Sequence, residues 1–179
     1  GMWEIEPFHD KEEDSGGIFK TILTMIYPKK YSSGQSRFYH HDVGSFWFQA
    51  EITKNGRTFR SPGLEASDNR GLSPKVFRVS IRGEKGYLGY LTTYLNVPGL
   101  FGSIPYQSGN YIGVDCADVL VAALCMWKKK PVKKDYNVAM LVRKFPKVAE
   151  FDLWEGEPNK LVKWHSQVRP GDFIAVRYS

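Results

Sequence analysis

A cysteine between two aspartates is the residue of this chain best suited to covalent chemistry. Cys116 stands in the stretch YIGVDCADVLVAAL, directly before an apolar segment with the composition of a buried helix. Asp115 is a good N-cap residue, and Asp118, three positions on, completes an acidic variant of the capping box. We therefore expect Cys116 in the first helical turn, where free N–H groups and the helix dipole stabilise the nucleophilic thiolate.

The same cysteine also fits a structural role, because a lone cysteine at a helix start is usually a small packing residue. The carboxylates of Asp115 and Asp118 oppose the helix dipole, so the local sequence leaves both interpretations open. Cys125 follows nine residues later on the same predicted helix. The two thiols then point to opposite sides, and the sequence predicts neither a disulfide nor a Cys-x-x-Cys metal pair.

Two stretches of the second half carry a family resemblance. In YLNVPGLFGSIPYQSGNYIGVDCADVLVAAL, the residues Tyr94-Leu95, Pro98, Gly102 and Gly113 precede Asp115-Cys116, and VRPGDFIAV follows with Pro170-Gly171-Asp172. In this order they resemble the NlpC-type cell-wall cysteine peptidases, a papain-like family. That family has a helix end, a glycine-rich loop, a Gly-x-Asp-Cys motif and, later, a Pro-Gly-Asp turn into its small barrel. The resemblance covers about residues 86–179.

The resemblance implies a reaction on bacterial peptidoglycan. The Cys116 thiolate attacks an amide bond of a stem peptide, a histidine moves the proton, and water hydrolyses the thioester. The N–H of Cys116 is the expected oxyanion donor, and no cofactor or metal is expected. The family's histidine lies on the strand after the Pro-Gly-Asp strand, which would fall beyond Ser179. We therefore expect an incomplete domain, completed by a further C-terminal segment or a second chain.

The chain departs from the family pattern around the cysteine. Ala117-Asp118 replaces the usual Ser-Gly, and the tyrosine that follows the family's proline is missing after Pro98. Tyr106 or Tyr111 is the candidate supporting residue in its place.

Four histidines are the possible bases within the chain. His165 is the candidate, although it precedes the Pro-Gly-Asp turn and so lies one strand too early. His9 is expected to be solvated. His40 and His41 are adjacent and point oppositely on an extended stretch, which argues against a metal site.

The first half of the chain is typical of an antiparallel sheet. Strands are expected over residues 18–27, 45–53, 57–61 and 75–83, with a hairpin turn at Asn55-Gly56. The alternation predicts two sets of inward side chains, which are Phe46, Phe48, Ala50 and Ile52 on one strand and Phe77, Val79 and Ile81 on another. These strands define a predicted β-rich domain over residues 1–85.

Helical patterns dominate the second half, for which an α+β domain over residues 86–179 is predicted. Helices are expected over residues 86–95, 116–127 and 135–145, with a loop over 98–113 and a final strand over 173–178. The helix 116–127 is apolar nearly all round, so we expect it to be buried.

The net charge of +6 favours anionic partners. The one dense basic cluster, Lys128–Lys130 with Lys133 and Lys134, is expected to complement a helix C-terminus and not to bind nucleic acid. No apolar run is long enough to predict a membrane span. The resemblance to cell-wall peptidases implies an extracytoplasmic protein. Gly1-Met2 resembles the remnant of an expression tag, so the signal sequence is expected to have been removed.

Two other functions fit the same residues. A non-catalytic cell-wall-binding or scaffold module would retain the papain-like helix only for packing. A transglutaminase-like or other papain-related enzyme would also use a cysteine at a helix start.

Overall fold

The computed structural model describes residues 3–9, 19–28, 42–154, 157–158, 160, 163 and 166–176. In the first two ranges only the backbone and the side chain of Ile26 are described. The chain forms two compact units, Gly1–Asp135 and Tyr136–Ser179. The predicted division at residues 85 and 86 stays a prediction.

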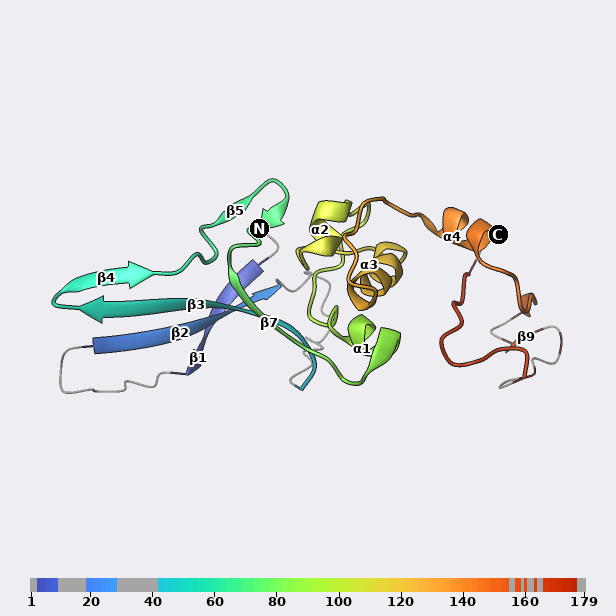
Figure 1. Cartoon of the computed structure of the whole chain (residues 1–179), viewed down its shortest axis with the longest axis horizontal. Coiled ribbons are helices and arrows are strands. Elements are labelled where there is room, and N and C mark those ends of the chain that lie inside the picture. The colour runs from blue at the N-terminus through green and yellow to red at the C-terminus, as the bar shows by residue number, and fades with distance from the viewer. Residues whose placement is uncertain are drawn as a thin grey trace. The chain divides into compact units, whose positions relative to one another are not determined.

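A five-stranded antiparallel sheet forms the first half of the larger unit (Figure 1). Its strands are β1 (Trp3–His9), β2 (Phe19–Pro28), β3 (Gly44–Lys54), β4 (Arg57–Arg60) and β7 (Phe77–Ile81). They follow the order β1-β2-β3-β4, and β7 pairs with the other end of β3. Between β4 and β7, the short strands β5 (Ser67–Asp68) and β6 (Gly71–Leu72) pair with each other. The predicted small antiparallel sheet is confirmed.

The turn between β3 and β4 is the predicted Asn-Gly hairpin. Asn55 and Gly56 have φ angles of 51° and 72°, and Lys54 pairs with Arg57 across the turn. Two consecutive positive φ angles are characteristic of a type I′ turn, whose twist matches that of the flanking strands. This register determines which side chains of β3 and β4 share a face.

The predicted inward orientation of β7 is wrong. Phe77, Val79 and Ile81 are exposed, whereas Trp47 of β3 is 3% exposed and belongs to the core. Instead, Arg78 of β7 faces the helices, where it donates a hydrogen bond of 2.8 Å to the carbonyl oxygen of Asn110. Successive side chains of a strand point to opposite faces of the sheet. Because Arg78 points to the side on which Trp47 is buried, Phe77, Val79 and Ile81 point to the opposite side.

The orientation predicted for β3 is correct only in part. Phe46 and Phe48 are buried as expected, but Ala50 is half-buried and Ile52 is exposed. Trp47, between the two phenylalanines, is buried as well. The first half of β3, residues 44–48, is thus buried on both faces, and the end that leads into the β3–β4 hairpin is not.

Four helices follow the sheet or lie in the smaller unit. They are α1 (Gly86–Thr92), α2 (Pro105–Gly109), α3 (Asp118–Trp127) and α4 (Val138–Lys144). The three expected helices are confirmed with shorter bounds, but α2 lies in the expected loop. Its sequence signals are Pro105 at the first position and Gln107, whose side chain accepts a 3.0 Å hydrogen bond from the Ile104 N–H.

The expectation that α3 is buried all round is wrong for the described structure. Asp118, Ala122 and Ala123 are buried, but Leu124 and Trp127 are exposed. Helix α3 packs against α1 and α2. Two neighbouring helices cover one side of a helix and leave the opposite side uncovered, whatever its hydrophobicity.

One hydrophobic cluster joins the sheet to the helices. It combines Ile26 and Trp47 from strands, Leu72 and Val76 from the connection, and Tyr94, Tyr111, Val114, Ala122 and Ala123 from the helical part. The hydroxyl of Tyr87 on α1 donates a 3.1 Å hydrogen bond to the Leu120 carbonyl oxygen of α3, and burial raises the pKa of Tyr87 to about 12. Residues on both sides of the predicted division therefore contribute to one core.

The smaller unit contains α4, a two-residue hairpin and the Pro-Gly-Asp turn. Strands β8 (Leu153–Trp154) and β9 (Glu157–Pro158) form the hairpin. The turn is confirmed, since the Asp172 N–H donates to the Arg169 carbonyl oxygen at 3.0 Å and Gly171 has a φ of 98°. The final strand is wrong over residues 173–176, which pair with no described strand. A β-strand requires a ladder partner, and Ile174 is 77% exposed.

Among the described residues, no helix has both the length and the apolar character that crossing a membrane requires.

Candidate active site at the start of helix α3

The backbone around Cys116 is a hydrogen-bonded turn that leads directly into α3. The Asp115 carboxylate accepts hydrogen bonds from the N–H groups of Ala117 at 2.9 Å and Asp118 at 2.8 Å. The Asp115 carbonyl oxygen accepts the first helical hydrogen bond, from Val119 at 3.1 Å. These bonds close the turn that leads into α3. The helix itself begins at Asp118, with Ala117 as its N-cap residue, so Cys116 lies two residues before it and not in the first helical turn, where it was predicted.

The predicted capping box is closed through a third residue. Ser103, from the loop before α2, donates its hydroxyl to the Asp118 carboxylate at 2.7 Å and accepts the Asp115 N–H at 3.0 Å. Asp118 is 2% exposed, so its carboxylate needs such partners in the core. In the predicted capping box, the Asp118 carboxylate would accept the Asp115 N–H directly. In the structure the Ser103 hydroxyl accepts this N–H and itself donates to the Asp118 carboxylate.

The role of Ser103 was not predicted from the sequence. It lies 12 residues before Asp115 and 15 before Asp118, and no motif spacing links the three. Only the path of the loop between α1 and α2 brings its hydroxyl to the helix start.

Cys116 itself combines an exposed thiol with an available backbone donor. Both cysteines are free, Cys116 is exposed and Cys125 is partly buried. The Asp115 carboxylate occupies the next two N–H groups, whereas no group in the described part of the chain accepts from the Cys116 N–H. An exposed thiol and a backbone N–H without an acceptor among the described groups therefore belong to the same residue.

The cap can be tested by removing its carboxylate. Asp115→Ala should lower the free energy of unfolding by about 1 kcal/mol, because two N–H groups at the start of α3 lose their acceptor. Asp115→Asn should retain most of the stability, since an amide oxygen also caps. Urea titration followed by circular dichroism measures both. Equal stability of the alanine variant and the wild type would show that the two hydrogen bonds to the Asp115 carboxylate do not stabilise the start of α3.

Tyr111, one of the two candidate supporting residues, lies in the hydrophobic core. Its ring stacks on that of Tyr94 at 4.4 Å, and its hydroxyl lies 3.1 Å from that of Thr93. The Arg78 guanidinium lies over the Tyr111 ring, 4.0 Å from the ring centre. Desolvation by burial lowers the pKa of Arg78. Tyr111 is 5% exposed, so these contacts give it a structural role.

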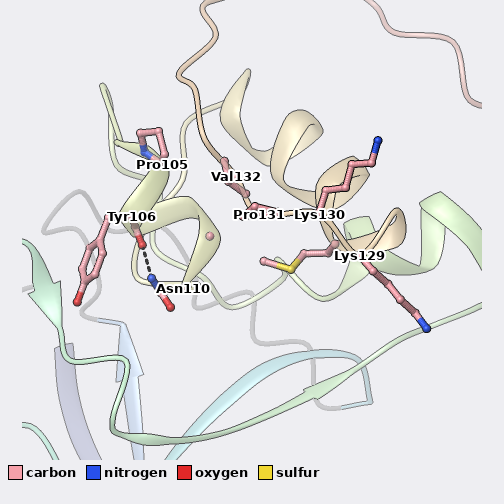
Figure 2. A pocket seen from close by; sticks show the side chains of 9 residues that line it. Pro105, Tyr106, Asn110, Lys129, Lys130, Pro131 and Val132 are labelled. Atoms are coloured by element: carbon pink, nitrogen blue, oxygen red, sulfur yellow. Dashed lines mark hydrogen bonds between the residues drawn. The ribbon is translucent and has the colours of Figure 1, made fainter.

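Tyr106, the other candidate, lies on α2 and lines an open depression of about 570 Å³ (Figure 2). Asn110 donates a 2.8 Å hydrogen bond to the Tyr106 carbonyl oxygen, and Arg70 lies 4.5 Å from the Tyr106 ring centre. Lys129 and Lys130, after α3, extend away from each other at the opposite wall. Cys116 does not line this depression.

The base is not located by the described structure. His40, His41 and the candidate His165 lie outside the described residues, and of His9 only the backbone, in β1, is described. Within the part of the chain that is described, no group of three or more His, Cys, Asp or Glu residues is arranged to hold a metal ion.

Comparisons with family models, curated proteins and solved structures give no match. No family is shown. The resemblance to NlpC-type peptidases therefore stays a prediction from the sequence, and the mixed α/β architecture with its antiparallel sheet is what the structure itself establishes.

Proposed function

We propose that this protein is a cysteine hydrolase that cleaves an amide or peptide bond in the stem peptides of bacterial peptidoglycan, outside the cytoplasm. The observation that carries the proposal is the pairing at Cys116 of an exposed thiol with an N–H that has no acceptor among the described groups. The substrate class and the location rest on the resemblance to the NlpC-type family and on the net charge of +6, which favours anionic wall polymers.

The reaction follows from these groups. The Cys116 sulfur attacks the amide carbon, and the carbonyl oxygen becomes an oxyanion that the Cys116 N–H stabilises. The C–N bond then breaks, and the leaving amine takes the proton that a histidine removed from the thiol. Water adds to the thioester and releases the carboxylic acid and the free thiol. His165 is the candidate histidine within the chain, and a further segment or a second chain is the other source.

Selective alkylation tests the nucleophile directly. Iodoacetamide should modify Cys116 at least about tenfold faster than Cys125 in the folded protein, because reactivity follows thiolate character and exposure. Peptide mass spectrometry over a time course measures both rates. Unfolded protein provides the control, in which the two thiols should react alike. Equal and slow modification of both thiols in the folded protein would count against the proposal.

A non-catalytic cell-wall-binding module is the second candidate. The burial of Tyr111 favours it, since one of the two residues proposed to support catalysis is occupied in the core. If the protein is such a module, the wild type and the Cys116→Ala variant would bind peptidoglycan fragments equally well, and neither would hydrolyse them. Release of an amine without cleavage of stem peptides would instead indicate a transglutaminase-like enzyme.

A further inference from the structure

The open depression beside α2 has no role in the proposed hydrolysis (Figure 2). Its volume is about 570 Å³, and ligand sites commonly measure about 300–1,000 Å³. All the residues that line it belong to the larger unit, and Cys116 is not among them. The depression is therefore a candidate for a second, separate function.

Apolar side chains form part of its wall. Pro105 begins α2, and Met126 lies in the last turn of α3. Pro131 and Val132 follow α3. Met126 and Val132 also pack against the hydrophobic core, which fixes their positions. An aliphatic side chain of a ligand can therefore leave water here against a surface that already exists.

The turn after α3 places two lysines on the depression. Lys129 has a φ of 53°, and its N–H donates to the Met126 carbonyl oxygen at 3.1 Å. The Lys130 N–H donates to the Cys125 carbonyl oxygen at 2.8 Å. These two bonds and the left-handed residue close the end of the helix, and Pro131 follows. The backbone that carries the two ammonium groups is therefore fixed.

The charges of these two lysines are not compensated by the described carboxylates. Both side chains are exposed, and neither ammonium group pairs with a described carboxylate. Residues 128–135 contain five lysines and one aspartate, and no acidic residue lines the depression. At the opposite wall, the Arg70 guanidinium beside Tyr106 pairs with Asp68 at 2.9 Å. The helix dipole stabilises exposed cations only weakly, so both lysines remain available to an anionic partner.

The directions of the two lysines select an extended partner. Figure 2 shows that Lys129 and Lys130 extend away from each other, so one small anion does not contact both ammonium groups in this arrangement. Stacking of a nucleic-acid base is disfavoured, because the Arg70 guanidinium already lies 4.5 Å from the centre of the Tyr106 ring. Side chains two residues apart in an extended peptide point to the same side. A peptide with a carboxylate on each side of an aliphatic residue therefore matches two separate cations and an apolar wall.

Asn110 offers a contact for the backbone of such a peptide. Its side-chain nitrogen donates to the Tyr106 carbonyl oxygen at 2.8 Å, and no described group donates to its side-chain oxygen. A hydrogen bond from a peptide N–H to this oxygen would orient an extended chain on the depression. Backbone hydrogen bonds combined with side-chain pockets are a common mode of peptide recognition.

We propose that the depression binds an extended acidic segment of a protein partner, in which two carboxylates flank an aliphatic side chain. The aliphatic side chain contacts Met126 and Val132, and the carboxylates contact the ammonium groups of Lys129 and Lys130. A backbone N–H of the segment donates to the side-chain oxygen of Asn110. This interaction does not depend on Cys116 or on the proposed hydrolysis.

Fluorescence anisotropy tests the proposal on the full chain, with a labelled peptide of sequence Gly-Glu-Ala-Leu-Ala-Glu-Gly. Binding should be saturable, and salt should weaken it because salt screens exposed charges. A peptide with glutamine in place of both glutamates should bind at least about tenfold more weakly. A peptide with alanine in place of leucine should bind about fivefold more weakly through the loss of buried apolar surface.

Variants of the protein locate the binding to the depression. Lys129→Gln and Lys130→Gln should each weaken binding about threefold, the effect of one exposed ion pair. Lys75→Gln is the matched control, because Lys75 is exposed and does not line the depression. Met126→Gln should weaken binding about fivefold, whereas Leu124→Gln, on the same helix but outside the depression, should bind as the wild type does. The lysine variants should keep the wild-type thermal midpoint.

Four outcomes would overturn the proposal. They are no saturable binding at millimolar peptide, equal binding of the glutamine peptide, equal effects of the control and depression variants, and tighter binding of single-stranded DNA that the lysine variants also weaken. The last outcome would assign the lysines to a nucleic acid. Cys116→Ala should bind the peptide as the wild type does, so failure of the proposed hydrolysis and failure of this proposal are distinguishable.

Discussion

Replacing Cys116 with alanine should reduce the hydrolysis of peptidoglycan stem peptides by at least about a thousandfold, to the background of the uncatalysed reaction. The variant loses the sulfur that forms the thioester, and the other thiol, Cys125, lies near the far end of α3. Cys116→Ser should be nearly as inactive, because a hydroxyl without strong activation is a poor nucleophile at neutral pH. Release of soluble peptides, measured by chromatography and mass spectrometry, reports the activity.

The control for this experiment is the other thiol. Cys125→Ala should keep nearly full activity, since Cys125 lies near the opposite end of α3. Cys116 is exposed, so its truncation should leave the thermal midpoint nearly unchanged and exclude misfolding as the cause of inactivity. Full activity of Cys116→Ala would refute the proposed hydrolase. If the wild type does not hydrolyse stem peptides, and the wild type and Cys116→Ala bind peptidoglycan fragments equally well, the result would support the binding module instead.

Replacing Trp47 with alanine should lower the free energy of unfolding of the larger unit by about 3–5 kcal/mol. The indole is 3% exposed and belongs to the cluster that joins strands to helices. Its removal leaves a cavity that the surrounding side chains fill only in part. Urea titration should show the loss as a shift of one transition, seen alike by signals from the strands and from the helices.

Trp127→Ala is the matched comparison for this core variant. Trp127 is 40% exposed at the end of α3, with the Lys128 ammonium 3.9 Å from its ring centre, and its truncation should cost about 1 kcal/mol or less. A Trp47→Ala transition that affects only the strand signal would show two independent domains, in agreement with the predicted division at residues 85 and 86. A shared transition would show that the division falls inside one cooperative unit.

Local sequence was sufficient for the features that depend on a few neighbouring residues. The Asn55-Gly56 turn, the backbone hydrogen bonds to the Asp115 carboxylate and the Pro170-Gly171-Asp172 turn were predicted and confirmed, whereas the helix after Asp115 begins two residues later than predicted. Each of them is set by residues within about four positions, through φ preferences or a side chain that bonds its own backbone. The position of Cys116 directly before a helix could therefore be predicted without the tertiary structure.

Burial was the feature that the sequence could not determine. The patterns of β7 and α3 show which side chains are apolar, but they do not show how much apolar surface the neighbouring elements cover. Arg78 faces the helices because its guanidinium donates a hydrogen bond to the Asn110 carbonyl oxygen and lies over the Tyr111 ring. Phe77, the preceding residue of the strand, therefore points outward.

The candidate site divides in the same way. The sequence by itself identified the candidate thiol and the Asp115 carboxylate that accepts the N–H groups after it, because both depend on adjacent residues. Only the tertiary structure brought Ser103 to Asp118 and Tyr111 into the core, since these contacts depend on where a loop crosses a helix. Contacts between residues distant in the sequence follow from the packing of whole elements, which a local pattern does not encode.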